Sequence, residues 1–143
     1  MTSATASKDL IQMHKLVAKI LGIIVAALAI VGFFIEGTHL FGLMNVDIAL
    51  DITRTVVALV LLYVGFGRVS DSAARLVVAI VGGMYIVMGL VTFIDPTHFG
   101  ILPTGFTGFD VGFHLIVGAA AVVIGFLPNR TPERTSRLNP RAA

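Results

Sequence analysis

Two pairs of ionisable residues stand near the start of long apolar segments, where they could do chemistry. Asp51 and Arg54 are three positions apart, and Asp110 and His114 are four apart, so each pair would share one face of a helix. Each pair could form an ion pair, and the Asp110 carboxylate would then favour the protonated form of His114. A charged residue at the centre of a membrane span costs about 2.5–3.5 kcal/mol on insertion scales. These four residues are therefore candidates for a site.

Four further residues have types that bind metal ions. Glu36 and His39 are three positions apart, as are Asp95 and His98, and several transition metals accept carboxylate together with imidazole. In di-iron bundles Glu-x-x-His pairs lie on facing helices. Here a glycine or a proline interrupts each pair, which argues against helical geometry. The alternative is that all four are ordinary loop residues.

The composition indicates which elements must position these residues. Hydrophobic residues make up 57% of the 143 residues and charged residues 13%, whereas soluble domains average about 45–50% apolar and about 25% charged residues. The chain is therefore predicted to be an integral membrane protein. It has no cysteine, which excludes disulfides, thiolate metal sites and cysteine nucleophiles. No cofactor is predicted, and no basic patch with interleaved aromatic residues indicates nucleic-acid binding.

Four apolar segments are each long enough to cross a bilayer, which takes about 20 residues. They cover residues 16–35, 48–66, 73–94 and 109–127. Together they predict an all-α, four-helix membrane bundle in one domain, residues 15–128. Residues 1–14 are expected to be a disordered head, and the basic residues 129–143 a disordered tail. A signal peptide is a competing interpretation of the first segment, but the apolar run continues past the small residues 27–29 where cleavage would occur.

Lysine and arginine are distributed unevenly along the chain. Nine of the ten precede the first span or lie at its start, lie in or beside the turn between the second and third spans, or follow the fourth, and Arg54 is the exception. The connections at residues 36–47 and 95–109 contain neither lysine nor arginine. Because basic residues favour the cytoplasmic side, both termini are predicted to be cytoplasmic and the two long loops external.

The two halves of the chain also resemble each other. Residues 34–39 read FIEGTH and residues 93–98 read FIDPTH, and at the same offset of 59 residues Asp51 corresponds to Asp110. Since each half has two spans, the copies would cross the membrane in the same sense, as a parallel internal repeat of two helix hairpins. The two ionisable pairs would then meet near a pseudo-twofold axis and form one polar cluster, open to the outside.

The start of the fourth span reads D-x-x-x-H-x-x-x-G, at Asp110, His114 and Gly118. In this motif, in the four-span layout and in the outer loop that leads to a polar second span, residues 16–127 resemble a bacterial membrane family, the domain of unknown function 4383 family. The chain departs from that family at Asp51 and Arg54, where the family tends to have asparagine and histidine. The resemblance implies an architecture and a bacterial origin, but no activity, because the family has none assigned.

Three functions fit these observations. The first is a non-enzymatic structural or interaction module of the bacterial cytoplasmic membrane, in which the polar cluster holds the two hairpins together. The second is a small transporter or an ion- or proton-responsive sensor that uses the polar cluster. The third is a metal- or redox-binding subunit that uses His39, His98 and His114. The expected partners are the lipid bilayer and either further copies of the chain or a larger membrane complex.

Overall fold

The computed structural model describes the main chain of residues 3–127 and the side chains of residues 13–127. This part of the chain consists of four helices and one very short β-hairpin. In chain order the elements are α1 (Ser3–Phe34), β1 (His39–Leu40), β2 (Met44–Asn45), α2 (Ile48–Phe66), α3 (Asp71–Val91) and α4 (Gly108–Phe126). The two strands pair antiparallel, with His39 opposite Asn45.

All four helices contain a stretch that is long and apolar enough to cross a membrane. These stretches are Met13–Phe34, Ile48–Phe66, Asp71–Val91 and Gly108–Phe126. Each agrees with the span predicted from the sequence to within three residues at either end. The predicted all-α fold with four such helices is therefore confirmed.

The first helix is longer than the sequence suggested. The main chain is helical from Ser3, so nearly all of the segment predicted as a disordered head belongs to α1. The physical reason is that six of the twelve residues at positions 3–14 are alanine, lysine, leucine, glutamine or methionine, which are good helix formers. Residues 1–2 and the predicted tail at 129–143 lie outside the described residues.

The starts of the other helices have local causes that can be read in the sequence. Ser70 caps α3 by accepting the N–H three residues further on, and Thr107 forms a reciprocal capping box with Asp110 at the start of α4. The first N–H of α2, from Ile48, donates to the Glu36 carboxylate at 2.6 Å. Side chains thus satisfy main-chain N–H groups that the helices leave without partners.

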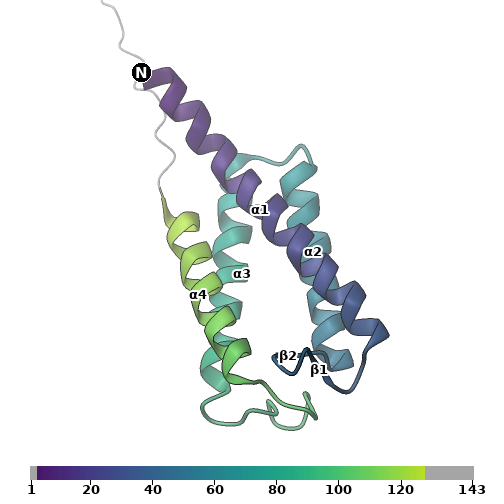
Figure 1. Ribbon diagram of the computed structural model, residues 1–143. Helices are drawn as coiled ribbons and strands as arrows, with labels where there is room; N and C mark the ends of the chain where they lie inside the picture. The colour runs from purple at the N-terminus through teal and green to yellow at the C-terminus, as the bar shows by residue number, and fades with distance from the viewer. Residues whose placement is uncertain (1–2, 128–143) are drawn as a thin grey trace, which may run out of the picture.

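The helices pack as two hairpins, α1 with α2 and α3 with α4 (Figure 1). Glycines bring the two helices of each hairpin close together. A Cβ on Gly82 of α3 would lie 2.7 Å from the carbonyl oxygen of Gly118 on α4, and a Cβ on Gly65 of α2 would lie 2.7 Å from the Lys19 side chain on α1. The apolar core between the hairpins contains side chains from all four helices, including Val25, Leu61, Val78 and Ala121.

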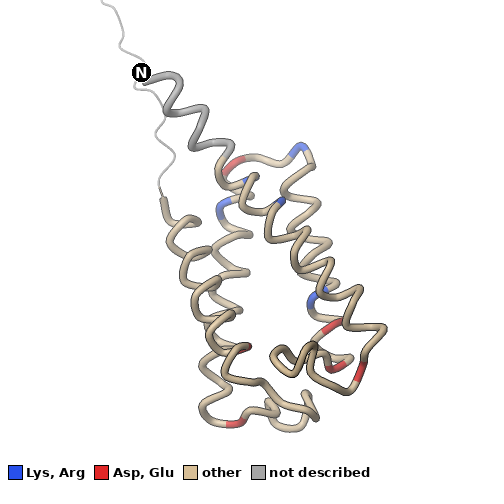
Figure 2. The backbone as a smooth tube through the Cα atoms, viewed as in Figure 1, with Lys and Arg blue, Asp and Glu red and all other residues tan. Residues whose placement is uncertain are grey.

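The bundle has two chemically different ends. At one end, here called the basic end, the turn between α2 and α3 lies beside the end of α4 (Figure 1). Among the described side chains, lysine and arginine gather towards this end, apart from Arg54 (Figure 2). The opposite end, here called the loop end, carries residues 35–47 and 92–107. The loop end also carries Asp47, Asp51 and Asp110, three buried carboxylates.

Candidate functional site

Asp51 and Arg54 form the ion pair that their spacing predicted. Arg54 Nη1 donates to Asp51 Oδ1 at 2.6 Å. The exposed fraction is 6% for Arg54 and 0% for Asp51. Gly32 on α1 leaves the space that the carboxylate occupies, because a Cβ built on Gly32 would overlap it. The pair is therefore enclosed between α1 and α2 rather than open to the outside.

Asn45 links this ion pair to α4. Arg54 Nη2 donates to the Asn45 carbonyl at 2.9 Å, and the Asn45 N–H donates to the two carboxylate oxygens of Asp110 at 3.1 and 3.0 Å. All three residues are buried. The main chain of one β2 residue therefore connects the predicted cluster across the two hairpins.

Asp110 and His114 do not form the side-chain pair expected from their spacing. His114 Nδ1 lies 2.8 Å from the main-chain carbonyl of Asp110, and because a carbonyl only accepts, Nδ1 must carry the proton. The Asp110 carboxylate faces the loops instead, where it accepts the Thr107 N–H at 2.9 Å. Capping of α4 thus competes with the i, i+4 contact and prevails.

A second carboxylate makes the reciprocal contact between the loops. Asp47 accepts the Thr104 N–H at 3.0 Å, and it also accepts Nδ2 of Asn45 at 2.7 Å. Asn45 and Thr104 are related by the same offset of 59 residues as Asp51 and Asp110. Each hairpin therefore offers the main-chain N–H of an equivalent residue to a carboxylate of the other. We call Asn45, Asp47, Thr104, Thr107 and Asp110 the interloop network.

The four candidate metal ligands are engaged separately. Glu36 caps α2, and Asp95 accepts N–H groups within its own turn. His39 and His98 each place Nε2 about 3 Å from a main-chain carbonyl, at 3.1 and 3.0 Å. These two nitrogens therefore act as donors and do not offer a lone pair to a metal. Among the described residues, no three or more histidine, cysteine or acidic side chains are grouped so as to hold a metal ion.

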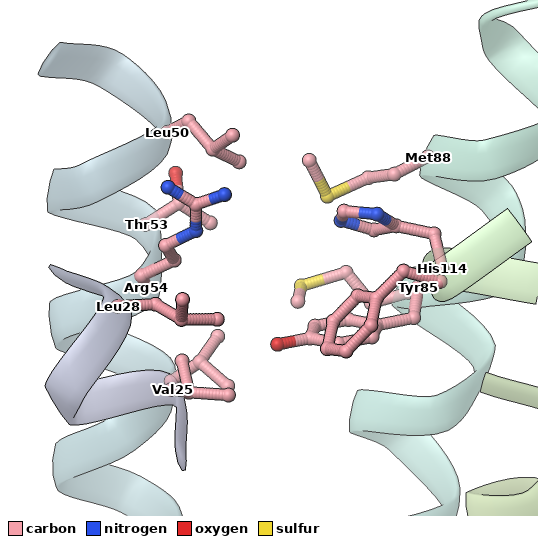
Figure 3. Close-up of a pocket in the computed structure, with 11 residues that line it drawn as sticks. Val25, Leu28, Leu50, Thr53, Arg54, Tyr85, Met88 and His114 are labelled. Carbon is pink, nitrogen blue, oxygen red and sulfur yellow. The ribbon is translucent and has the colours of Figure 1, made fainter. Parts of the chain in front are cut away.

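A small cavity lies between the two hairpins and near the ion pair. Its volume is about 10 Å³, which is room for one water-sized molecule. Arg54 of α2 lies on one side, and His114 of α4 and Tyr85 of α3 lie on the other (Figure 3). Polar groups of both hairpins thus face one small cavity, which otherwise has mostly apolar walls.

The Asp95 turn gives a testable dependence on pH. The Thr97 hydroxyl donates to Asp95 Oδ1 at 2.7 Å and the Thr97 N–H donates at 2.8 Å, and these bonds hold the pKa of Asp95 below its ordinary value of 3.8. A carboxyl whose pKa is lowered by folding stabilises the fold above its unfolded pKa, and this stabilisation is lost as the pH falls through the folded pKa.

We therefore expect the amide NMR signals of Thr97 and Phe99 to titrate with a midpoint below pH 3.8 in detergent micelles. Both N–H groups donate to Asp95, so both should report its protonation. In Asp95→Asn this titration should disappear while the signals remain dispersed. A midpoint at or above pH 3.8 in the native sequence would contradict the expectation.

Most of the interloop network was not predicted from the sequence. Asn45, Asp47 and Thr104 fall in the predicted connections between spans. Two signals were present: the spacing of Thr107 and Asp110 fits a capping box, and the offset of 59 residues aligns Thr104 with Asn45. Neither signal shows by itself that the two loops would contact each other.

Comparisons of the chain with protein-family models, with curated proteins and with solved structures give no match. The resemblance to the domain of unknown function 4383 family therefore stays a prediction from the motif at residues 110–118.

Proposed function

We propose that the chain is a small, non-enzymatic, multi-pass protein of a bacterial cytoplasmic membrane, and that it serves there as a structural or interaction module. The observation that carries this proposal is the interloop network. The network uses the buried carboxylates Asp47 and Asp110 to join one hairpin to the other, and the ion pair of Asp51 with Arg54 extends it.

The membrane location is supported by the surface of the four helices. Large apolar side chains that point away from the bundle are exposed on every helix, for example Ile30, Leu59, Ile80 and Ile116. Exposure of so large an apolar surface to water would be unfavourable, whereas lipid tails would cover it favourably. The gathering of lysine and arginine at the basic end supports an orientation with this end, and hence both termini, on the cytoplasmic side.

A parallel internal repeat is supported by the reciprocal contacts between the loops. Asn45 and Thr104 occupy equivalent positions in the two halves, and each donates its N–H to the other half. The pairing of α1 with α2 matches the pairing of α3 with α4 (Figure 1). In this proposal each repeat supplies one hairpin, and the loops hold the hairpins together.

The physical reason for such a network lies in the membrane. Hydrophobic attraction does not hold helices together in lipid, because lipid tails are as apolar as the side chains. Close packing and polar contacts must do so instead. Carboxylates that accept N–H groups of the opposite hairpin, as Asp47 and Asp110 do, are suited to that structural role.

The ion pair provides the test of this structural role. Removing one partner of a buried pair costs about 3–5 kcal/mol, because the other charge is left without a partner. We therefore expect Asp51→Asn and Arg54→Gln each to lower the free energy of unfolding in detergent by about that amount. The double variant should lose clearly less than the sum of the two. Arg68→Gln, which changes an exposed arginine of the α2–α3 turn, is the control. Strict additivity of the two losses would contradict the structural role.

The cavity between the hairpins favours a second candidate function, a small transporter or an ion- or proton-responsive sensor. Arg54, Tyr85 and His114 meet there from both hairpins. At about 10 Å³ the cavity takes one water-sized molecule, so a larger substrate would require the hairpins to move apart, as repeats do in transporters. Proton or ion flux through vesicles that contain the protein, abolished by His114→Gln in a folded chain, would establish this function in place of the structural one.

A further inference from the structure

The two loops at the loop end each contain the same tight turn. We call these two turns, residues 40–43 and 98–101, the loop tips. In each, the N–H of the fourth residue donates to the carbonyl of the first, at 3.0 and 3.3 Å. The main-chain angle φ is 52° at Phe41 and 61° at Phe99, and the glycines that follow them have φ of 70° and 82°. Positive φ at both central residues is the mark of a type I′ turn.

Phenylalanine is a costly choice for the first central position of such a turn. Glycine, asparagine and aspartate are the residues favoured there, and a bulky residue with positive φ is an outlier because its Cβ crowds the main chain. Strain of this kind persists only where the surrounding structure holds it. The local conformation therefore does not explain a phenylalanine in both turns, and the reason has to lie in what the two rings contact.

The two rings do not fill the interior of the loops. Phe41 is 90% exposed and Phe99 is 72% exposed, and the aliphatic residues that complete the turns, Leu43 and Ile101, are exposed as well. Other side chains form the loop interior, among them the buried Leu102. Each loop tip thus places an aromatic and an aliphatic side chain on the surface, on both hairpins.

The charges of the loop end favour an uncharged, apolar partner for these side chains. Residues 35–47 and 92–107 contain no lysine or arginine. Their carboxylates accept main-chain N–H groups of the protein itself, at Glu36, Asp47 and Asp95. The exposed rings therefore have no basic residue beside them in either loop that could attract an acidic partner.

The distribution of aromatic residues points to lipid as that apolar partner. Tryptophan and tyrosine usually flank membrane spans at the bilayer interface, but the chain has no tryptophan and two tyrosines. Tyr85 is buried, and Tyr63 lies in the last turn of α2, at the basic end. At the loop end phenylalanine takes this place. Phe34, the last residue of α1, and Phe93, which follows α3, are exposed too, and they continue the lipid-facing surface of the helices towards the loops.

We propose that the loop tips are lipid contacts, in which the rings of Phe41 and Phe99 enter the boundary between headgroups and acyl chains of the outer leaflet. This proposal rests on the membrane location proposed above. Aromatic and aliphatic side chains at this depth anchor interfacial segments, while the hydrated headgroups accommodate polar groups such as the Asp95 carboxylate. One loop tip on each hairpin fixes the height of the loop end relative to the bilayer.

Tryptophan fluorescence tests where the loop tips lie, because the native chain has no tryptophan. The probes are Phe41→Trp and Phe99→Trp in phosphatidylcholine vesicles whose acyl chains are brominated near the glycerol end or near the methyl end. Both indoles should be quenched more strongly by bromine near the glycerol end, and only weakly by iodide present on both sides of the membrane. Leu59→Trp, on an exposed position in the middle of α2, is the control and should be quenched most by bromine near the methyl end.

Two results would overturn the proposal. Strong quenching by iodide without quenching by bromine, at either loop tip, would place that ring in water. Protection from both quenchers would place the ring against protein, such as a second copy of the chain. The control separates these results from a failure of the membrane location itself, since in that case the indole of Leu59→Trp would not be quenched by either brominated lipid.

Asparagine at the same positions separates lipid contact from a role in folding. Asparagine is favoured in type I′ turns, so Phe41→Asn and Phe99→Asn should keep the loops folded. In detergent micelles, the amide NMR signals of Asn45 and Thr104, whose N–H groups donate between the loops, should stay at their native positions. Leu102→Asn, which puts a polar group at a buried site, is the control and should shift them. If Phe41→Asn shifted these signals as much as Leu102→Asn, the ring would serve the fold and the proposal would fail.

Discussion

Replacing Asp110 with alanine is expected to lower the free energy of unfolding by about 1–3 kcal/mol for each of the two main-chain N–H groups that lose their acceptor. These N–H groups belong to Asn45 and Thr107. Asp110 is fully buried, so water cannot replace the carboxylate without opening the loop end. The same substitution removes the reciprocal half of the capping box on α4.

Unfolding in a mixed-detergent titration, followed by circular dichroism, measures this loss. Asp95→Ala is the matched control, because Asp95 also accepts two main-chain N–H groups but stands in a turn that water reaches. It should lose clearly less stability than Asp110→Ala. Asp110→Asn should fall between the native chain and Asp110→Ala. Its amide oxygen can still accept N–H groups, but the amide is uncharged, and its NH2 group cannot accept from the Asn45 N–H as Oδ1 does. Equal losses for Asp95→Ala and Asp110→Ala would refute the importance of the interloop network.

Gly82→Ala is expected to destabilise the second hairpin by about 1–3 kcal/mol, the usual cost of overpacking a close contact. The added Cβ would lie 2.7 Å from both the Gly118 carbonyl oxygen and the Val122 nitrogen on α4. These are main-chain atoms, so α3 and α4 must separate to make room. A Cβ on Gly118 would lie 2.8 Å from the Gly82 carbonyl oxygen, which makes Gly118→Ala a second substitution at the same crossing with the same expected result.

The neighbouring residue provides the control for this prediction. A Cβ on Gly83 would meet no atom within 4 Å, and alanine is favoured over glycine in a helix by about 1 kcal/mol. Gly83→Ala should therefore be neutral or slightly stabilising in the same unfolding titration. If Gly82→Ala were as stable as Gly83→Ala, the two helices would not depend on that close approach.

The helices could be predicted because their signals are local and strong. A run of about 20 apolar residues allows few other structures, and the predicted spans differ from the observed stretches by at most three residues. The pairing of Asp51 with Arg54 was equally local, since it depends on one turn of one helix. The outer limit of α1 was missed because good helix formers extend it beyond the apolar run.

The contacts between distant segments were not predictable in the same way. The spacing of Asp110 and His114 correctly placed both on one helix, but it could not show that the Asn45 and Thr107 N–H groups would take the carboxylate. That outcome depends on how the loops fold, including the left-handed main chain at Phe41 and Gly105. The burial of His14, whose exposed fraction is 0%, was also missed, because this residue falls in the predicted polar head, where nothing in the sequence indicates burial.

The reciprocal contacts between the loops also have a consequence for biosynthesis. The chain is made from the N-terminus, so residues 36–47 leave the ribosome well before Thr104 and Asp110. Until those residues arrive, the Asn45 N–H and the Asp47 carboxylate have no partner in the second hairpin and must be satisfied by water or by lipid headgroups. The first loop can therefore reach its final structure only after the fourth helix has been inserted, and a nascent chain that stops after α3 would carry an unfinished first loop.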